Sequence, residues 1–174
     1  MSMRAFLVSA IACLLASCGY HISGRADLVP KTVQTIAIPR FGNLTTHYQL
    51  TDRIPEALSR EFIARTRYRI VTDPNQADAI LRGTVTRFLS IPTILDPQTS
   101  RAAAVQISVT MQVSLTNRRT GAVIWQRPSF ESRQQYEIAS QQQQDAYFDE
   151  SGVALDRLCR ETAQAVVSAI LENF

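Results

Sequence analysis

Residues 102–116 read AAAVQISVTMQVSLT, and from position 105 onward apolar and polar side chains alternate. The apolar set consists of Val105, Ile107, Val109, Met111, Val113 and Leu115. The polar residues between them are uncharged: Gln106, Ser108, Thr110, Gln112, Ser114 and Thr116. A period of two that is held this long predicts a strand with one buried and one exposed face.

The neighbouring segments extend this strand into an antiparallel sheet. Asn117–Gly121 predicts a hairpin turn, with glycine where a positive φ is needed, and Val123–Phe130 returns as the next strand. Ala79–Ile91 predicts the preceding strand, and Ile94–Ser100 a connection. The central part of the protein is therefore expected to be a meander of long strands.

Two shorter apolar segments complete the predicted sheet. Thr32–Pro39 predicts a first strand that ends at the proline, and Phe41–Asn43 a turn. Tyr68–Val71 predicts a short second strand. The polar stretch Glu131–Ala146 is expected to be irregular, and its part Gln134–Gln144 either contacts a partner or forms a surface loop.

Two segments have helical periodicity. The first starts near Leu50, with Thr51 as the expected N-cap and Pro55 in the first turn, where proline is tolerated. Its apolar stripe is Leu50, Ile54, Leu58 and Phe62. The second is expected to open at Asp149 or Ser151. Its stripe is Leu155, Leu158, Cys159, Thr162, Val166 and Ile170.

The expected order is β-α-β-β-β-β-α. Because each helix has one apolar stripe and the sheet one apolar face, we predict an α+β two-layer sandwich. Two helices would pack on one face of a mixed or antiparallel sheet of about four strands. The opposite face would carry Gln106, Ser108, Thr110, Gln112 and Ser114. This face suits contact with a polar protein surface or a sugar-bearing ligand, and an ordinary solvated face remains the alternative.

The N-terminus has the layout of a secretory signal. Arg4 precedes an apolar run from Ala5 to Ala16, which is shorter than the ~20 residues of a membrane-spanning helix. Leu15–Cys18 resembles the bacterial lipobox, in which the cysteine is acylated and the chain is cut before it. We therefore expect a signal peptide at 1–17, a lipid on Cys18 and one domain at 18–174. Gly19 in place of aspartate favours the outer membrane.

Composition excludes several classes of function. Removal of Arg4 lowers the formal charge from +3 to +2, which is too small an excess for a nucleic-acid-binding domain. Besides Cys18, only Cys159 remains after cleavage, and it falls on an apolar helical stripe. His21 and His47 lack the companions that a metal site needs, and no nucleophile or phosphate-loop motif is present. The sequence thus predicts no cofactor, no metal and no enzyme.

Several motifs together resemble the LptE family of lipopolysaccharide-assembly lipoproteins. They are CGYH at 18–21, LVP at 28–30, TIAIP at 35–39, ADAILRGTV at 77–85 and GAVIW at 121–125. The resemblance implies a lipoprotein that plugs an LptD-like β-barrel and helps to place lipopolysaccharide in the outer leaflet. The implied location is the periplasmic side of the outer membrane, where the chain is held by acyl chains. Arg87, Arg101 and Arg127 are the candidates for binding lipopolysaccharide.

Two alternatives remain open at this stage. Ile36–Asn43 also resembles a strand of lipoproteins that build curli-secretion pores or activate peptidoglycan synthases. A periplasmic hydrolase that uses His21, His47 and Asp145 is the other alternative.

Overall fold

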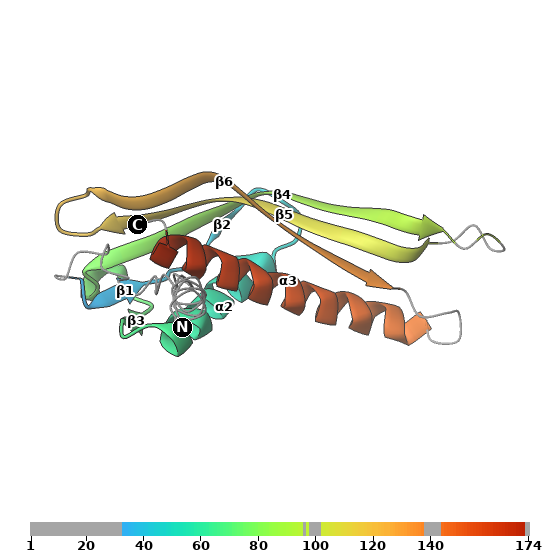
Figure 1. Cartoon of the computed structure of the whole chain (residues 1–174), viewed down its shortest axis with the longest axis horizontal. Coiled ribbons are helices and arrows are strands. Elements are labelled where there is room, and N and C mark those ends of the chain that lie inside the picture. Colours follow the sequence, from blue (N-terminus) through green and yellow to red (C-terminus); the bar gives the residue numbers. More distant parts are fainter. Residues whose placement is uncertain (1–32, 96, 98–101, 138–143, 173–174) are drawn as a thin grey trace, which may run out of the picture.

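The computed structural model describes residues 33–95, 97, 102–137 and 144–172. Cys18 and Arg101 lie outside these residues. The elements are β1 (Thr35–Ala37), β2 (Gly42–Asn43), α2 (Leu50–Arg65), β3 (Arg69–Val71), the 3-10 helix η1 (Pro74–Gln76), β4 (Ala79–Leu95), β5 (Ala102–Asn117), β6 (Val123–Glu137) and α3 (Gln144–Glu172). Figure 1 shows α2 and α3 side by side on one side of a long, twisted sheet.

The sheet is mixed, and its order is β3-β1-β4-β5-β6, with β2 also paired to β4. The short strands run parallel to their neighbours, and the three long strands form an antiparallel meander. The predicted α+β sandwich with two helices is confirmed. The sheet has six strands rather than about four: the five strands of the predicted order all join it, and residues 42–43 add a sixth by pairing with β4 where a turn was predicted. The turn follows Asn43, whose side chain bonds Thr45 and His47.

Three predicted boundaries are wrong. β4 ends at Leu95 instead of Ile91, β6 at Glu137 instead of Phe130, and α3 begins at Gln144. The extension of β6 is polar, so its side chains gave no strand signal. Its backbone pairs residue by residue with β5, from Glu131 opposite Thr110 to Glu137 opposite Ala104. Pairing with a strand that is itself well packed therefore fixes this segment.

The predicted N-cap at Thr51 is also wrong. Helix α2 begins at Leu50, and Gln49 before it makes no side-chain capping bond. Pro55 lies inside the helix and has no N–H, so the carbonyl of Thr51 lacks its usual helical donor. The backbone N–H of Phe41 donates to that carbonyl at 3.1 Å. The proline thus frees an acceptor that ties α2 to Phe41, the residue just before β2.

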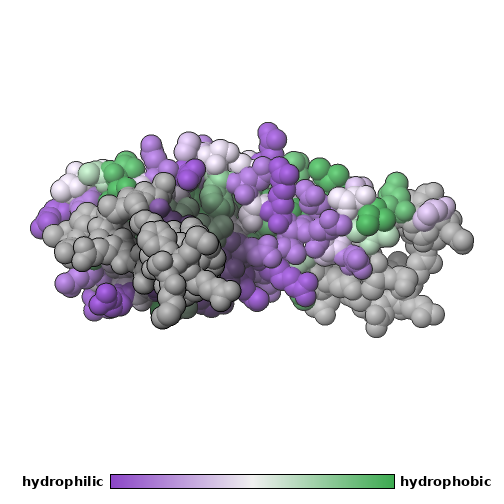
Figure 2. Space-filling view, viewed as in Figure 1, coloured by the Kyte–Doolittle hydropathy of each residue, from purple (hydrophilic) through white to green (hydrophobic). Residues whose placement is uncertain are grey.

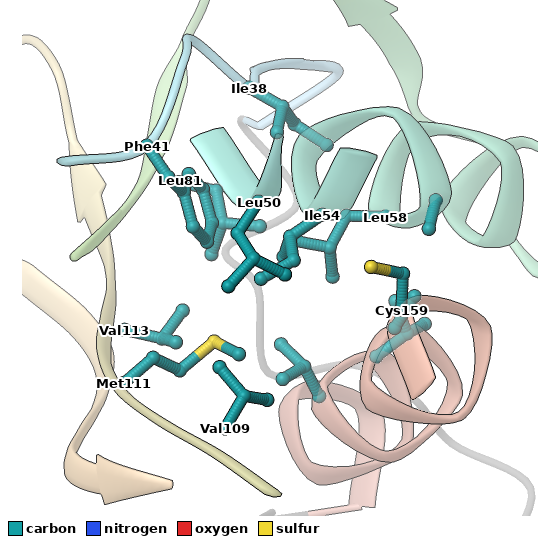
Figure 3. Close-up of a cluster of buried hydrophobic side chains, with 14 of the residues drawn as sticks. Ile38, Phe41, Leu50, Ile54, Leu58, Leu81, Val109, Met111, Val113 and Cys159 are labelled. Carbon is teal, nitrogen blue, oxygen red and sulfur yellow. The ribbon is translucent and has the colours of Figure 1, made fainter. Parts of the chain in front are cut away.

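The core lies between the helix pair and the sheet (Figure 3). Fully buried side chains of α2, Leu50, Ile54 and Leu58, face Met111 and Val113 of β5. The α3 stripe completes the core with Leu158, Cys159, Thr162, Val166 and Ile170, all buried as predicted. The apolar half of the β5 alternation therefore faces the helices, and the polar half faces away.

Candidate functional site

A register shift in β4 determines which side chains reach the helix-free side of the sheet. Arg82 lies opposite Ser114, but after Val85 one residue, Thr86, is left unpaired and Arg87 lies opposite Thr110. Such a bulge moves every following side chain to the other face. Arg87 thereby joins Arg82 on the side that faces away from the helices.

We call this side the open face. By register its central row is the polar half of β5, flanked by one row from β4 and one from β6. The β4 row is Arg82, Thr84, Arg87, Leu89 and Ile91, and the β6 row is Gln126, Glu131, Arg133 and Gln135. No described helix lies on the open face (Figure 1).

The five predicted polar residues of β5 differ in exposure, and four of them are buried or half-buried. Ser108 is only 8% exposed, since Leu89 and Arg133 lie opposite it on the two neighbouring strands. Gln106, Thr110 and Ser114 are half-buried, and Gln112 is exposed. Much of the central row therefore consists of shorter side chains that lie between longer ones on the two neighbouring strands.

The arginines of the open face differ in their partners. Arg133 donates to Glu131 through two bonds of 3.0 and 3.1 Å, and this contact is the main reason that the pKa of Glu131 lies below its ordinary value. A smaller contribution comes from the charge of Arg87. Among the described residues, Arg82 and Arg87 form no ion pair. Their guanidinium groups are the ones available for an anion.

Arg82 also lines a hollow at the start of β4. The hollow has a volume of about 370 Å³, and it lies between the η1 residues Pro74 and Asn75 and the β5–β6 turn. Arg118 is another lining residue, and its side chain donates to the carbonyl of Ala77 at 2.5 Å. Two cations at a polar hollow suit a phosphate or carboxylate group.

Asp78 has a structural role beside this hollow. Its carboxylate accepts from the backbone N–H groups of Gln34 and Thr35, both at 2.9 Å, and from the Thr35 hydroxyl at 2.8 Å. These bonds, the Gln34 one first, hold its pKa below the ordinary value. Asp78 therefore joins the start of β1 to the start of β4.

Sequence reasoning predicted part of this surface. Arg87 is on the open face with the five polar β5 residues, whereas Arg127 is exposed and lies opposite Val113, on the core-facing side of β5. Arg82 and Arg133 were not predicted from the sequence. Arg82 lies between Leu81 and Gly83, so the alternation along the strand could have placed its side chain on the face opposite to that of Leu81. Arg133 fell in the segment interpreted as irregular.

Within the part of the chain that the structure describes, no cluster of His, Cys, Asp or Glu could hold a metal ion. The described helices include none that is both long and apolar enough to cross a membrane. The open face brings together uncharged polar side chains and two arginines, Arg82 and Arg87, that form no ion pair among the described residues. The fold defines the chain as an α+β sandwich domain with two helices on one side of a mixed sheet.

The family is then given by comparison. The family model described as "LptE: Lipopolysaccharide-assembly" matches residues 33–170, so the chain belongs to the LptE family. No curated protein matches the sequence.

Solved structures of similar fold include several bacterial lipoproteins. The rare lipoprotein B of Shewanella oneidensis is 13% identical over 80% of this chain and 92% of its own, with a TM-score of 0.51. The lipoprotein B of Nitrosomonas europaea is 16% identical over 80% and 88%, with a TM-score of 0.51. A PelC dodecamer from Paraburkholderia phytofirmans is 15% identical over 79% and 88%, with a TM-score of 0.53. At these identities the likeness concerns the fold alone.

Proposed function

We propose that this chain is the lipoprotein partner of an LptD-like outer-membrane β-barrel and acts in lipopolysaccharide transport. Residues 1–17 are the signal peptide, Cys18 carries the lipid, and residues 18–174 form one domain on the periplasmic side of the outer membrane. More than one acyl chain on Cys18 gives stable anchoring, because a single chain binds only marginally. The domain works by binding and steric control, with no catalysed step.

The observation that carries this proposal is the open face. Its central row consists of uncharged polar side chains, which are buried or half-buried between their neighbours except for the exposed Gln112. The inner wall of a large membrane barrel is polar, so this row can hydrogen-bond with it without bringing unpaired charges into the contact. Membership of a lipopolysaccharide-assembly family supports the same partner.

The arginines extend the proposal to the lipid itself. Lipopolysaccharide carries phosphate groups, and an arginine fork binds phosphate through two parallel bonds. Arg87 and Arg82 have no ion-pair partner among the described residues, so binding a phosphate would not break an existing pair. Arg101 and Arg127 remain candidates from the sequence. Arg101 is outside the described residues, and Arg127 is on the other side of the sheet by register.

The partner is tested by affinity purification of the tagged chain from detergent-extracted membranes, with Cys18 intact, followed by mass spectrometry. Recovery of a stoichiometric barrel of the LptD type is the expected result. Recovery with a peptidoglycan synthase, or as a homo-oligomer without a barrel, would refute the proposal and favour the secretion or activator lipoproteins.

Lipid binding is tested with a matched pair of charge reversals. Arg87→Glu on the open face should weaken binding of purified lipopolysaccharide several-fold, because it replaces a donor fork with a like charge. Arg119→Glu in the exposed β5–β6 turn makes the same change in net charge and should leave binding within twofold. Equal losses in the two variants would mean that only net charge matters.

A further inference from the structure

The outer edge of β4, the edge that does not face β5, is only partly occupied. β1 pairs with it at Ala79 and Ile80, and β2 pairs with it at Thr84 and Val85. No described strand continues the pairing beyond that point, although β4 itself runs on to Leu95. Along residues 87–95 this edge is therefore not paired with any described strand, and it continues directly from the part that pairs with β1 and β2.

The hydrogen-bond register shows which backbone groups point outward. The N–H of Leu44 donates to the carbonyl of Val85 at 2.8 Å, so the backbone N–H and C=O of Val85 point away from β5. After the bulge, Arg87 lies opposite Thr110, whose carbonyl faces β4 and accepts from the Thr86 hydroxyl at 3.1 Å. Alternate residues of an antiparallel strand point toward and away from their partner. Phe88 and Ser90 thus direct their N–H and C=O groups outward.

Pro92 is the next residue whose backbone is directed outward. Because proline has no N–H, no unpaired donor is exposed on the outer edge at this position. Proline in a sheet is confined to such edge positions. Its presence agrees with the register, and it marks where pairing on this edge weakens. Further register shifts follow between Pro92 and Leu95.

Beyond Arg87 this edge lacks the charged residues that normally protect a strand from pairing with other proteins. Residues 88–95 read FLSIPTIL and contain no charge, whereas the other long edge strand, β6, carries Arg127, Glu131, Arg133 and Glu137. Exposed edges are usually protected by charges, prolines or bulges. On β4 the bulge at Thr86 and the charge of Arg87 come before this stretch and Pro92 follows it, which leaves Phe88–Ile91 open to pairing.

Exposed apolar side chains are concentrated at the same edge. Of the nine large apolar side chains that are exposed among the described residues, six lie here: Leu44, Tyr48, Leu89, Ile91, Ile94 and Leu95. Leu44 and Tyr48 follow β2, and His47 between them stacks on Phe88 with ring centroids 3.8 Å apart. Figure 2 shows hydrophobic side chains gathered toward the end of the sheet where β4 ends. Apolar patches of this kind mark interaction surfaces.

We propose that the outer edge of β4 at residues 88–91 is a strand-addition site, and that its occupant is an extended, uncharged segment of the barrel protein. This rests on the function proposed above. Acyl chains would cover Leu89 and Ile91 but would leave the outward N–H and C=O groups of Phe88 and Ser90 without partners, which hydrocarbon cannot supply. An added peptide strand satisfies the backbone and the apolar side chains together. A second copy of this chain would bring two Pro92 defects into one ladder.

The test uses the full chain in its membrane, with the photoreactive residue p-benzoylphenylalanine at one position at a time. Placed at Ile91 it should crosslink to a peptide of the barrel, and at Ile63, an exposed position on α2, it should not. Placed at Gln112 of the open face it reports on the barrel partnership independently. Capture of the barrel from Gln112 but not from Ile91 overturns the strand-addition site alone, and capture from neither position overturns both proposals. Adducts of Ile91 with lipid only, or with a second copy, also overturn it.

A backbone substitution distinguishes strand addition from simple side-chain contact. Ser90→Pro removes the outward N–H, and Ser90→Ala changes the side chain alone. With the photoreactive group at Ile91, we expect the proline variant to give at least fivefold less barrel adduct than the alanine variant. Equal yields would overturn the inference.

A second pair decides the question if Ser90→Pro fails to fold. Ile91→Lys places an edge-protecting charge at a 50% exposed position, and Ile63→Lys makes the same change at a 64% exposed position on α2. The Ile91 variant should recover at least fivefold less barrel in affinity purification than the Ile63 variant. Equal recovery would overturn the strand-addition site.

Discussion

Gly83 in β4 tests how tightly Phe41, the residue before β2, is packed against the sheet. A Cβ built at this position would lie 2.1 Å from Cε2 and 2.3 Å from Cδ2 of the Phe41 ring. Carbon atoms in contact lie about 3.5–4.0 Å apart, so the ring must move by more than 1 Å in Gly83→Ala. Phe41 is 2% exposed and lies beside Leu81 and Leu50 (Figure 3), so it has no free space to enter.

The expected cost follows from overpacking. Insertion of a methyl group into a well-packed core costs about 1–3 kcal/mol. For a domain of this size each kcal/mol lowers the melting temperature by about 2–4 °C, so Gly83→Ala should melt roughly 2–12 °C lower. Gly152 provides the matched control, since it lies in α3 and nothing lies within 4 Å of its added Cβ. Gly152→Ala should raise stability by about 0.5–1 kcal/mol, because alanine is the better helix former.

The assay is thermal unfolding of the purified mature protein, followed by circular dichroism. A second substitution identifies the ring as the cause. Phe41→Leu creates space beside Gly83, so the double variant should be less destabilised than the sum of the single changes by about 1 kcal/mol. Equal melting of Gly83→Ala and the parent, or strict additivity in the double variant, would refute this account of the packing.

Two other predictions concern single titratable groups. Asp78→Asn should lower the melting temperature at pH 7, and the difference from the parent should shrink below about pH 4. The pKa of Asp78 is depressed in the folded state. The ionised carboxylate therefore stabilises the fold above its ordinary pKa of about 3.9, and this stabilisation is lost as pH falls through the folded pKa. A difference that stays constant down to pH 2 would contradict this. Burial raises the pKa of the Cys159 thiol to about 11, and the side chain is 3% exposed. Alkylation at Cys159, read by peptide mass spectrometry at pH 8, should therefore appear only with unfolding, and rapid labelling of the native protein would contradict the buried placement.

The parts of the fold that were predictable are those with periodic burial. The β5 alternation and the α3 stripe each repeat long enough that one face must be buried, and both faces were assigned correctly. The strand β2 and the end of β6 were missed for the opposite reason. These residues form strands because the backbone of a neighbouring strand provides hydrogen-bond partners. Neither Gly42 nor Gln134 has a side chain that indicates this pairing in the sequence.

The candidate site was harder to predict, because it depends on a bulge. A single unpaired residue at Thr86 has no compositional signature, but it decides the face of everything after it. Strict alternation from Arg82 would have placed Arg87 among the core side chains and Phe88 outside. The predicted role of Arg87 therefore came from the family resemblance, and the structure supplies the physical route by which this side chain reaches the open face.

The same bulge connects the two proposals. Upstream of Thr86 the outer edge of β4 is occupied by β1 and β2, and the open face carries Arg82 and Thr84. Downstream no described strand pairs with the edge, and the β4 row continues with Arg87 and then the apolar Leu89 and Ile91. At Thr86 the side chains of β4 change face and the pairing with β1 and β2 ends. The part of β4 before this residue builds the domain. The part after it has apolar side chains and backbone groups that are available to another molecule. An isolated protein gains nothing from an uncharged strand of this kind, since it promotes aggregation. Its presence is explained if the chain works inside a complex that covers it.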